Sequence, residues 1–361
     1  NILAVGDVDG KVRINGVLTQ VGQQFHGRVD LAGGLGGDTY IVTMFGDAGM
    51  LVKILDSGGA ADGTDSLRVY GSNLSSVGDT VLLRPNFVAA FPAVRGDAGY
   101  RISDRVNYTT ALEGGLAINT LLGDDTVVTD DNTIPATINT GGGRDTIQIG
   151  QIFGSERMTP RVAIGDEFET DAIDLTPAGQ ANQLIGYVSN GASLSLTVNA
   201  GEGNDTLVVF RNVADVQLNG EGGDDTFTVR AFALAGNPGG IAGVSGGAGA
   251  DFIEYATNAN VDINGGDGLD AVRVLGTQFG DTFIVTEDGV TGSGLMIHFT
   301  AVETLELHAG DGDDTVYVLG TPSNLRTTIY GGAGSDRFFI TGQAPGETDR
   351  LLDQLEAMIE D

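Results

Sequence analysis

Aspartates recur in this chain within a fixed setting of glycines, and carboxylates in that setting can bind a metal ion. The nine-residue pattern Gly-Gly-x-Gly-x-Asp-x-apolar-x is complete at residues 33–41, 246–254, 265–273 and 331–339. Copies that lack only the first glycine begin at Thr140, Ala200 and Ala309. A glycine-rich turn exposes main-chain carbonyls and the aspartate adds a carboxylate, and these are the oxygen ligands that Ca²⁺ prefers.

The aspartates at the sixth position of these turns are the predicted Ca²⁺ ligands. With the looser copies of the turn included, they are Asp38, Asp65, Asp125, Asp145, Asp205, Asp225, Asp251, Asp270, Asp314 and Asp336. The turns of Asp251 and Asp270 are both complete and only 19 positions apart, so this pair is the strongest candidate. Carboxylates stacked about 5 Å apart repel each other by about 0.8 kcal/mol per pair in water, and divalent ions between them would remove that repulsion. The alternative is a metal-free turn in which each aspartate bonds its own backbone.

The spacing of the aspartates predicts the elements that position them. Asp125 and Asp145 are 20 positions apart, and so are Asp205 and Asp225. After Asp125, Asp205 and Asp251 the same order recurs: a short stretch of alternating apolar residues, a break that carries Asn, and a second alternating stretch. Two strands of about four residues and two turns in each ~20-residue unit make one coil of a solenoid. The sequence therefore predicts an all-β parallel β-solenoid, of the β-roll or β-helix type, with loop excursions and a short C-terminal helix.

A larger duplication suggests how the chain is divided. Residues 62–71 match 267–276, and residues 124–127 match 313–316. We expect four segments: a first solenoid module at 1–150 with a loop excursion at 84–115, an atypical connecting segment at 151–195, a second solenoid module at 196–340, and a C-terminal amphipathic helix or cap at 341–361.

The expected C-terminal helix rests on the spacing of its apolar residues. Leu351, Leu352, Leu355, Met358 and Ile359 recur at intervals that place them on one face of a helix. Such a helix could cap the open end of the solenoid, or begin a segment that continues in a longer protein.

Composition excludes several classes of function. Lys and Arg number 18 against 49 Asp and Glu, which gives a formal net charge of −31 and argues against nucleic acid and anionic membranes as partners. Cysteine is absent, so the chain has no disulfide, no thiolate nucleophile and no Cys-ligated metal site. No 18-residue apolar run predicts a membrane span.

The repeated turn resembles the hemolysin-type calcium-binding repeat, also called the repeats-in-toxin motif. The resemblance implies a parallel β-roll that binds Ca²⁺ in its turns, in a bacterial protein exported to the medium or the cell surface. On this basis we expect a calcium-stabilised structural repeat region of a large secreted or cell-surface bacterial protein of the adhesin, surface-layer or extracellular-matrix type. The expected partners are calcium ions, with end-to-end self-association or cell-surface polysaccharide as further possibilities.

This chain departs from the family's pattern in one respect. The family repeats its nonapeptide every nine residues, so that both edges of the roll carry glycine–aspartate turns. Here the opposite turns are of the Asn type, as at Asn132 and Asn212. We therefore expect ions along one edge only.

Two other functions stay open. A carbohydrate-active β-helix enzyme, lyase-like or epimerase-like, would need a basic groove, for which Arg95, Arg101 and Arg105 are the candidate cluster. Residues 243–247 fit Gly-x-Ser-x-Gly, but they lie in a glycine turn without a strand–elbow–helix setting, so the sequence predicts no enzyme. The other alternative is a subunit of a filament or lattice, because uncapped solenoid ends are adhesive.

Overall fold

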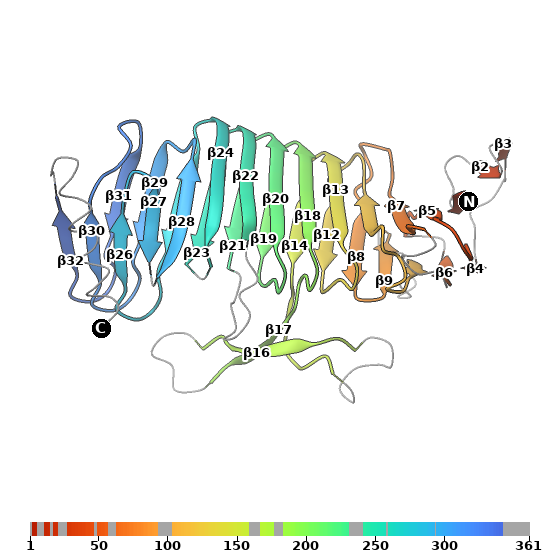
Figure 1. Cartoon of the computed structure of the whole chain (residues 1–361), viewed down its shortest axis with the longest axis horizontal. Helices are drawn as coiled ribbons and strands as arrows, with labels where there is room; N and C mark the ends of the chain where they lie inside the picture. The colour runs from red at the N-terminus through yellow and green to blue at the C-terminus, as the bar shows by residue number, and fades with distance from the viewer. Residues whose placement is uncertain are drawn as a thin grey trace.

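The protein is a rod built from two long β-sheets that lie face to face, with a small sheet projecting from its side (Figure 1). This computed structural model describes residues 2–5, 11–14, 17–20, 27–46, 49–56, 63–92, 103–158, 167–176, 183–230, 241–257, 259–292 and 294–341. Within these ranges the secondary structure is entirely β. The expected C-terminal helix at 341–361 lies outside the described residues, apart from Thr341.

The first sheet has 14 strands. In spatial order they are β1 (Ile2–Val5), β5 (Thr39–Thr43), β7 (Ser66–Tyr70), β11 (Leu116–Asn119), β13 (Ala136–Gly142), β18 (Leu196–Glu202), β20 (Val216–Gly222), β22 (Ile241–Gly249), β24 (Val261–Gly268), β28 (Leu295–Thr300), β27 (Gly289–Gly292), β26 (Thr282–Val285), β30 (Thr315–Val318) and β32 (Arg337–Ile340).

The second sheet has 13 strands. In spatial order they are β31 (Arg326–Tyr330), β29 (Thr304–His308), β25 (Ala271–Leu275), β23 (Phe252–Ala256), β21 (Thr226–Val229), β19 (Thr206–Val209), β14 (Thr146–Ile149), β12 (Thr126–Thr129), β8 (Thr80–Arg84), β9 (Phe87–Phe91), β10 (Asp104–Asn107), β6 (Leu51–Ile54) and β4 (Arg28–Leu31). A separate hairpin pairs β2 (Lys11–Ile14) with β3 (Val17–Gln20).

The chain winds between the two sheets, so that one coil supplies one strand to each. Thus β13 of the first sheet is followed by β14 of the second, and β20 by β21. Successive coils pair in parallel with no shift between equivalent positions, as Thr126↔Thr146 and Thr206↔Thr226 show. The predicted parallel β-solenoid is therefore confirmed.

Period-2 alternation places one apolar column of each strand inside the rod. In β19 the side chains of Leu207 and Val209 are buried, whereas Thr206 and Val208 between them are partly exposed. The buried residues of all coils form one continuous core between the sheets. A narrow core of this kind explains how a chain with 6% aromatic residues buries enough apolar surface to fold.

Polar side chains on the outer face hold neighbouring coils in register. The amide of Asn139 donates to Asn119 Oδ1 at 2.9 Å, that of Asn199 to Asn139 at 2.8 Å, and that of Asn219 to Asn199 at 2.7 Å. A shift of one residue would move this column into the core, so it specifies the register.

Two antiparallel hairpins interrupt the winding, and one of them corrects the predicted loop at 84–115. Within that range β9 and β10 are strands of the second sheet, and β9 pairs antiparallel with both β8 and β10. The rest of the range that the structure describes is connecting turn, and 93–102 lies outside the described residues. A second hairpin, β26–β27–β28, enters the first sheet in the same way.

The connecting segment at 151–195 forms the projecting sheet. It contains β15 (Ile152–Phe153), β17 (Ile185–Ser189) and β16 (Thr170–Asp174), which pair antiparallel in that order (Figure 1). This segment does not interrupt the two long sheets, because β13 pairs directly with β18 and β14 pairs directly with β19.

The glycine–aspartate turns occupy both edges of the rod, so the expectation that they are confined to one edge is wrong, while the edge that binds ions stays a prediction. At the forward edge, where the chain passes from the first sheet to the second, lie the turns of Asp79, Asp125, Asp145, Asp205, Asp225, Asp251 and Asp270. At the return edge, where it passes back, lie those of Asp38, Asp65, Asp281, Asp314 and Asp336. The repeat motif marks a turn but not which edge it serves. Asp65 and Asp79 lie at opposite edges because one strand, β7, separates them, and β25 separates Asp270 from Asp281 in the same way.

Because the glycine turns stack closely, the stability lost when a glycine is replaced by alanine should depend on its position in the stack. Gly201 has φ +106°, and a Cβ there would overlap the carbonyl oxygen of Gly141 in the preceding coil. We expect Gly201→Ala to lower the free energy of unfolding by more than about 1 kcal/mol, because conformational strain and overlap add. Urea unfolding followed by circular dichroism measures it.

Two further glycines provide matched controls. Gly36 also has positive φ, +101°, but its Cβ would meet nothing within 4 Å, so Gly36→Ala reports strain alone. Gly154 has neither a positive φ nor a neighbour within 4 Å, so Gly154→Ala should leave stability unchanged. Equal losses at Gly201 and Gly36 would contradict the role of close stacking.

Candidate metal centre and the aspartate ladder

The predicted ligand aspartates of the forward edge are stacked through the main chain. The N–H of Asp125 donates to Asp145 Oδ1 at 2.8 Å, that of Asp205 to Asp225 Oδ1 at 2.8 Å, and that of Asp251 to Asp270 Oδ1 at 2.8 Å. The remaining links run from Asp79 to Asp125 (2.7 Å), from Asp145 to Asp205 (2.7 Å) and from Asp225 to Asp251 (2.8 Å). We call this column, Asp79 to Asp270, the aspartate ladder. Each carboxylate thus ties its own coil to the coil before it.

Two short stacks at the return edge repeat the arrangement. There the N–H of Asp38 donates to Asp65 Oδ1 at 2.6 Å, that of Asp281 to Asp314 at 2.7 Å, and that of Asp314 to Asp336 at 3.1 Å. The metal-free alternative envisaged an aspartate bonding its own backbone. That bond occurs at the first residue of two stacks, because Asp79 Oδ2 accepts the N–H of Ser72 at 2.6 Å and Asp281 Oδ2 that of Thr277 at 2.7 Å. In the rungs that follow, Oδ1 instead accepts the N–H of the equivalent residue of the neighbouring coil.

The ladder carboxylates point inward and are buried. Asp205, Asp225, Asp251 and Asp270 are at most 2% exposed, and the Oδ2 atom of each has no hydrogen-bond partner. The first residue of the turn must be small to make room for this atom. A Cβ at Gly246, for example, would overlap both Asp251 Oδ2 and the carbonyl oxygen of Gly265.

A carboxylate oxygen and a main-chain carbonyl oxygen therefore lie beside each other at such rungs. Two oxygens with only lone pairs to offer repel each other in a buried site, and a proton or a cation between them removes the repulsion. Burial raises the pKa of Asp79, Asp125 and Asp205 to about 6 and that of Asp225 to about 7. For Asp225 the neighbouring carboxylates of Asp205 and Asp251 add to the effect of burial on the pKa. Burial thus makes these carboxyls easier to protonate in the folded rod than in the unfolded chain.

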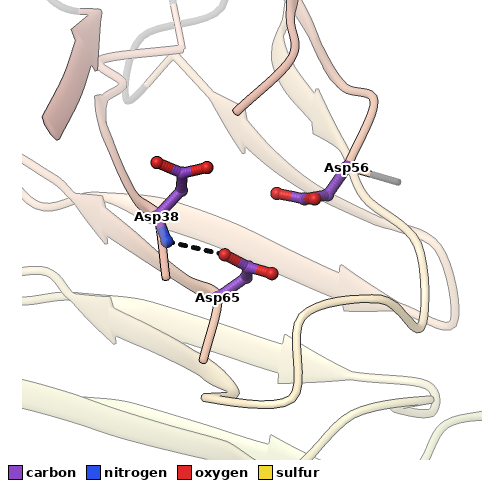
Figure 2. A group of neighbouring side chains, drawn as sticks. All are labelled: Asp38, Asp56 and Asp65. Carbon is purple, nitrogen blue, oxygen red and sulfur yellow. Dashed lines mark hydrogen bonds between the residues drawn. The ribbon is translucent and has the colours of Figure 1, made fainter. Parts of the chain in front are cut away.

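A different arrangement occurs near the N-terminal end of the rod, where Asp38, Asp56 and Asp65 converge (Figure 2). One carboxylate oxygen from each lies within 4.8 Å of the others. Asp38 and Asp65 precede β5 and β7, and Asp56 follows β6 of the opposite sheet. Among the residues that the structure describes, this is the one group of three acidic side chains so placed. We call it the three-aspartate centre.

Tyr40 holds Asp56 in this position. The Tyr40 hydroxyl donates to Asp56 Oδ2 and accepts the N–H of Gly33 at 2.8 Å. Tyr40 is fully buried, and burial, followed by the bond to Asp56, raises the pKa of its hydroxyl well above the ordinary value. Tyr40 therefore stays neutral and presents a donor to the carboxylate.

The donor set of the three-aspartate centre fits a hard divalent cation. Its ligand atoms are all carboxylate oxygens, and Asp65 is fully buried with an Oδ2 that has no hydrogen-bond partner. Ca²⁺ takes such oxygens and fills its remaining positions with carbonyls and water. In the ladder, as at Asp65, Oδ1 accepts a main-chain N–H; what distinguishes the centre is that three carboxylates converge there.

The ten predicted ligands thus have different surroundings. Asp38 and Asp65 belong to the three-aspartate centre, and Asp251 and Asp270 stack on one edge as expected. The other six, Asp125, Asp145, Asp205, Asp225, Asp314 and Asp336, also stack on the main chain of a neighbouring coil. Sequence reasoning missed Asp56, which lies outside the nine-residue pattern and is identified only by the pairing of β6 with β4 and β10. It also missed Glu303, which accepts the N–H of Asp270 at 2.8 Å and extends the ladder by one coil.

The arginine cluster proposed for an anionic substrate is described only in part. Arg105 lies on β10, where its guanidinium stacks 3.7 Å from the centroid of the Phe87 ring and its Nε donates to Asn107 at 2.6 Å. Arg95 and Arg101 lie outside the described residues.

No protein-family model matches the chain, and a search of curated proteins gives no significant match. The likeness to hemolysin-type repeats therefore rests on the turn motif itself. In the described part of the chain, no helix has the length and apolar character needed to cross a membrane. What the fold defines is a class of architecture, a two-sheet parallel β-solenoid with acidic turns.

The raised pKa values predict that the rod loses stability as pH rises when divalent cations are absent. A carboxyl whose folded pKa exceeds its unfolded value of 3.8 binds its proton more tightly in the folded state. Its contribution is complete below about pH 4 and is lost as pH rises through the folded pKa values of about 6 to 7. Thermal melts in EGTA between pH 4.5 and 8 should show a falling midpoint. A midpoint that rises with pH would contradict the protonated ladder.

Replacing a ladder aspartate with asparagine distinguishes a rung that binds a proton from a rung that binds a cation. Asp225→Asn keeps an oxygen for the N–H of Asp205 and places an NH₂ donor beside the Gly246 carbonyl, which the charged carboxylate cannot do. We expect Asp225→Asn to raise the melting midpoint at pH 8 and to flatten its pH dependence. Asp225→Ala removes the acceptor and should lower the free energy of unfolding by about 1–3 kcal/mol. Destabilisation by asparagine in calcium-containing buffer would instead indicate an ion at this rung.

Proposed function

We propose that this protein is a calcium-stabilised structural repeat region of a large secreted or cell-surface bacterial protein, of the adhesin, surface-layer or extracellular-matrix type. The observation that carries the proposal is the three-aspartate centre, an all-oxygen group in which Asp38, Asp56 and Asp65 come within 4.8 Å of one another. A rod with a continuous core and edges made of turns is an extended scaffold. This shape suits a protein that spans distance or presents a surface.

An ion at the three-aspartate centre would join consecutive coils. Asp38 and Asp65 belong to successive turns of the return edge, and Asp56 comes from the strand between them in the chain. Without a cation the three carboxylates repel one another, which weakens this end of the rod. Binding to the folded state alone stabilises it by mass action, by about 2.7 kcal/mol when the free ion is at 100 times its dissociation constant.

The net charge supports a mechanism in which calcium determines whether the chain folds inside or outside the cell. At −31 the unfolded chain repels itself, and it has only 18 basic side chains to offset 49 acidic ones. Low calcium inside a cell would favour the unfolded, export-competent chain, and millimolar calcium outside would favour the rod. Extracellular folding at a cell surface follows from this mechanism.

Calcium should raise the melting midpoint of the protein, and Asp56→Asn should remove that increase. The substitution takes one carboxylate from the centre, so we expect at least a tenfold loss of calcium affinity. In EGTA the variant should be at least as stable as the unmodified protein, because one of three mutually repelling charges is gone. Circular dichroism melts with 2 mM CaCl₂ or EGTA (about 2 mM, far above the chain concentration) measure both effects.

Asp288 provides the matched control. It is exposed and lies far along the chain from the three-aspartate centre, so Asp288→Asn removes the same charge without touching the site. The control should keep the full calcium response. Identical melts of the unmodified protein in calcium and in EGTA would remove the ion from the mechanism.

A further inference from the structure

The outer face of the second sheet carries a group of basic residues where β6, β10, β9 and β8 lie side by side. One row across these strands consists of Lys53, Asn107, Phe87 and Arg84, which pair in that order. Arg105 of β10 belongs to the next row, but its guanidinium stacks 3.7 Å from the centroid of the Phe87 ring and so reaches the first row. We call Lys53, Arg84 and Arg105 the basic patch.

Two members of the basic patch have no acidic partner in the part of the chain that the structure describes. Arg105 donates through Nε to Asn107 Oδ1 at 2.6 Å, and neither Arg105 nor Lys53 forms an ion pair there. The carboxylate opposite Lys53 is that of Asp30, which accepts from Arg28 at 3.0 Å. Two cations on one face are therefore left to an external ligand.

The positive charge of Arg105 is held at a cost. Burial, followed by the positive charge of Arg84, lowers the pKa of Arg105. Arg84 is itself paired with the buried carboxylate of Asp130, to which its Nε donates at 2.8 Å. An oxyanion bound beside Arg105 would offset the cost, because hydrogen bonds between a guanidinium and an oxyanion are strong and often bidentate.

The surface beside the basic patch is neutral, although the protein as a whole is strongly acidic. The outward positions of β8, β12, β14, β19 and β21 carry no Asp or Glu. Five of these positions form an unbroken column, Thr80, Thr126, Thr146, Thr206 and Thr226. The ladder aspartates of the same coils are buried in the turns. An anion of low charge density can therefore lie against this face beside hydroxyl and methyl groups.

The donor set of the basic patch indicates the class of ligand. A guanidinium stacked on a ring presents its planar N–H edge, which matches the two oxygens of a carboxylate. Lys53 adds an ammonium group, and Asn107 adds an amide NH₂ because its Oδ1 already accepts from Arg105. A neutral sugar ring suits the threonine face next to the patch, so a sugar that carries a carboxylate fits both parts.

We propose that the basic patch binds an acidic saccharide, with the sugar carboxylate on Arg105 and Lys53 and the rest of the sugar against the neutral outer face of the second sheet. The proposal concerns binding and not catalysis. It involves no calcium ion, so it stands independently of the three-aspartate centre.

Titration of the full chain with trigalacturonate in calcium-free buffer tests the proposal. The Arg105 Nε–H signal should shift in ¹⁵N NMR spectra. Arg105→Gln and Lys53→Gln should each weaken binding at least about fivefold, because each removes one charged donor, while the circular dichroism of the rod stays unchanged. Arg144→Gln is the matched control, since it removes an exposed arginine from a forward-edge turn, and it should leave the affinity unchanged.

Other saccharides and free anions separate the possible ligands. A neutral galactose trimer should not bind, and sulfate and inorganic phosphate should bind at least about tenfold more weakly than trigalacturonate. Equal binding of sulfate or phosphate would make the patch a site for free anions and overturn the saccharide. Absence of any shift with trigalacturonate, or full binding by both glutamine variants, would refute the site, whereas the calcium response of the melting midpoint would be unaffected.

Discussion

The structure depends on one hydrogen bond repeated from coil to coil, from the main-chain N–H of one turn aspartate to Oδ1 of the next. Parallel strands alone would hold the sheets together, but the turns between them would leave buried N–H groups without acceptors, which is costly. The inward aspartate supplies that acceptor, and the small residue at the first position of the turn makes room for it. The nine-residue pattern is therefore a structural requirement for stacking turns before it is a requirement for any ion.

The inter-coil hydrogen bond uses Oδ1 and leaves Oδ2 of each carboxylate. The surroundings of Oδ2 distinguish two kinds of acidic site. At the forward edge the oxygen is buried beside a carbonyl, and burial raises the pKa of Asp225 to about 7, so a proton satisfies it below neutral pH. At the three-aspartate centre Asp56 from another strand converges on Asp38 and Asp65, and three carboxylates together are better satisfied by a divalent cation. One turn motif thus serves two purposes, and the difference comes from what the neighbouring strand brings to it.

The sequence predicted the solenoid, its parallel pairing and the stacking of Asp251 on Asp270, because these follow from local period and spacing. It could not predict which edge each turn occupies. That depends on how many strands separate successive turns: one strand separates Asp65 from Asp79, which lie at opposite edges, whereas Asp205 and Asp225 are two strands apart and share an edge. Asp56 and Glu303 were missed because each joins its site through pairing between segments that are distant in the sequence. The direction of the aspartate side chains was also beyond the pattern, because a turn motif does not say whether a carboxylate faces solvent or the core.

The number of calcium ions bound per chain tests the central claim most directly. If the ladder carboxylates bind the main chain and only the three-aspartate centre is free to take a cation, isothermal titration calorimetry at pH 7.5 should give about one tight site per chain. A stoichiometry that approaches the number of stacked aspartates would show that ions, and not main-chain amides, hold the turns together at this pH, and would contradict this account.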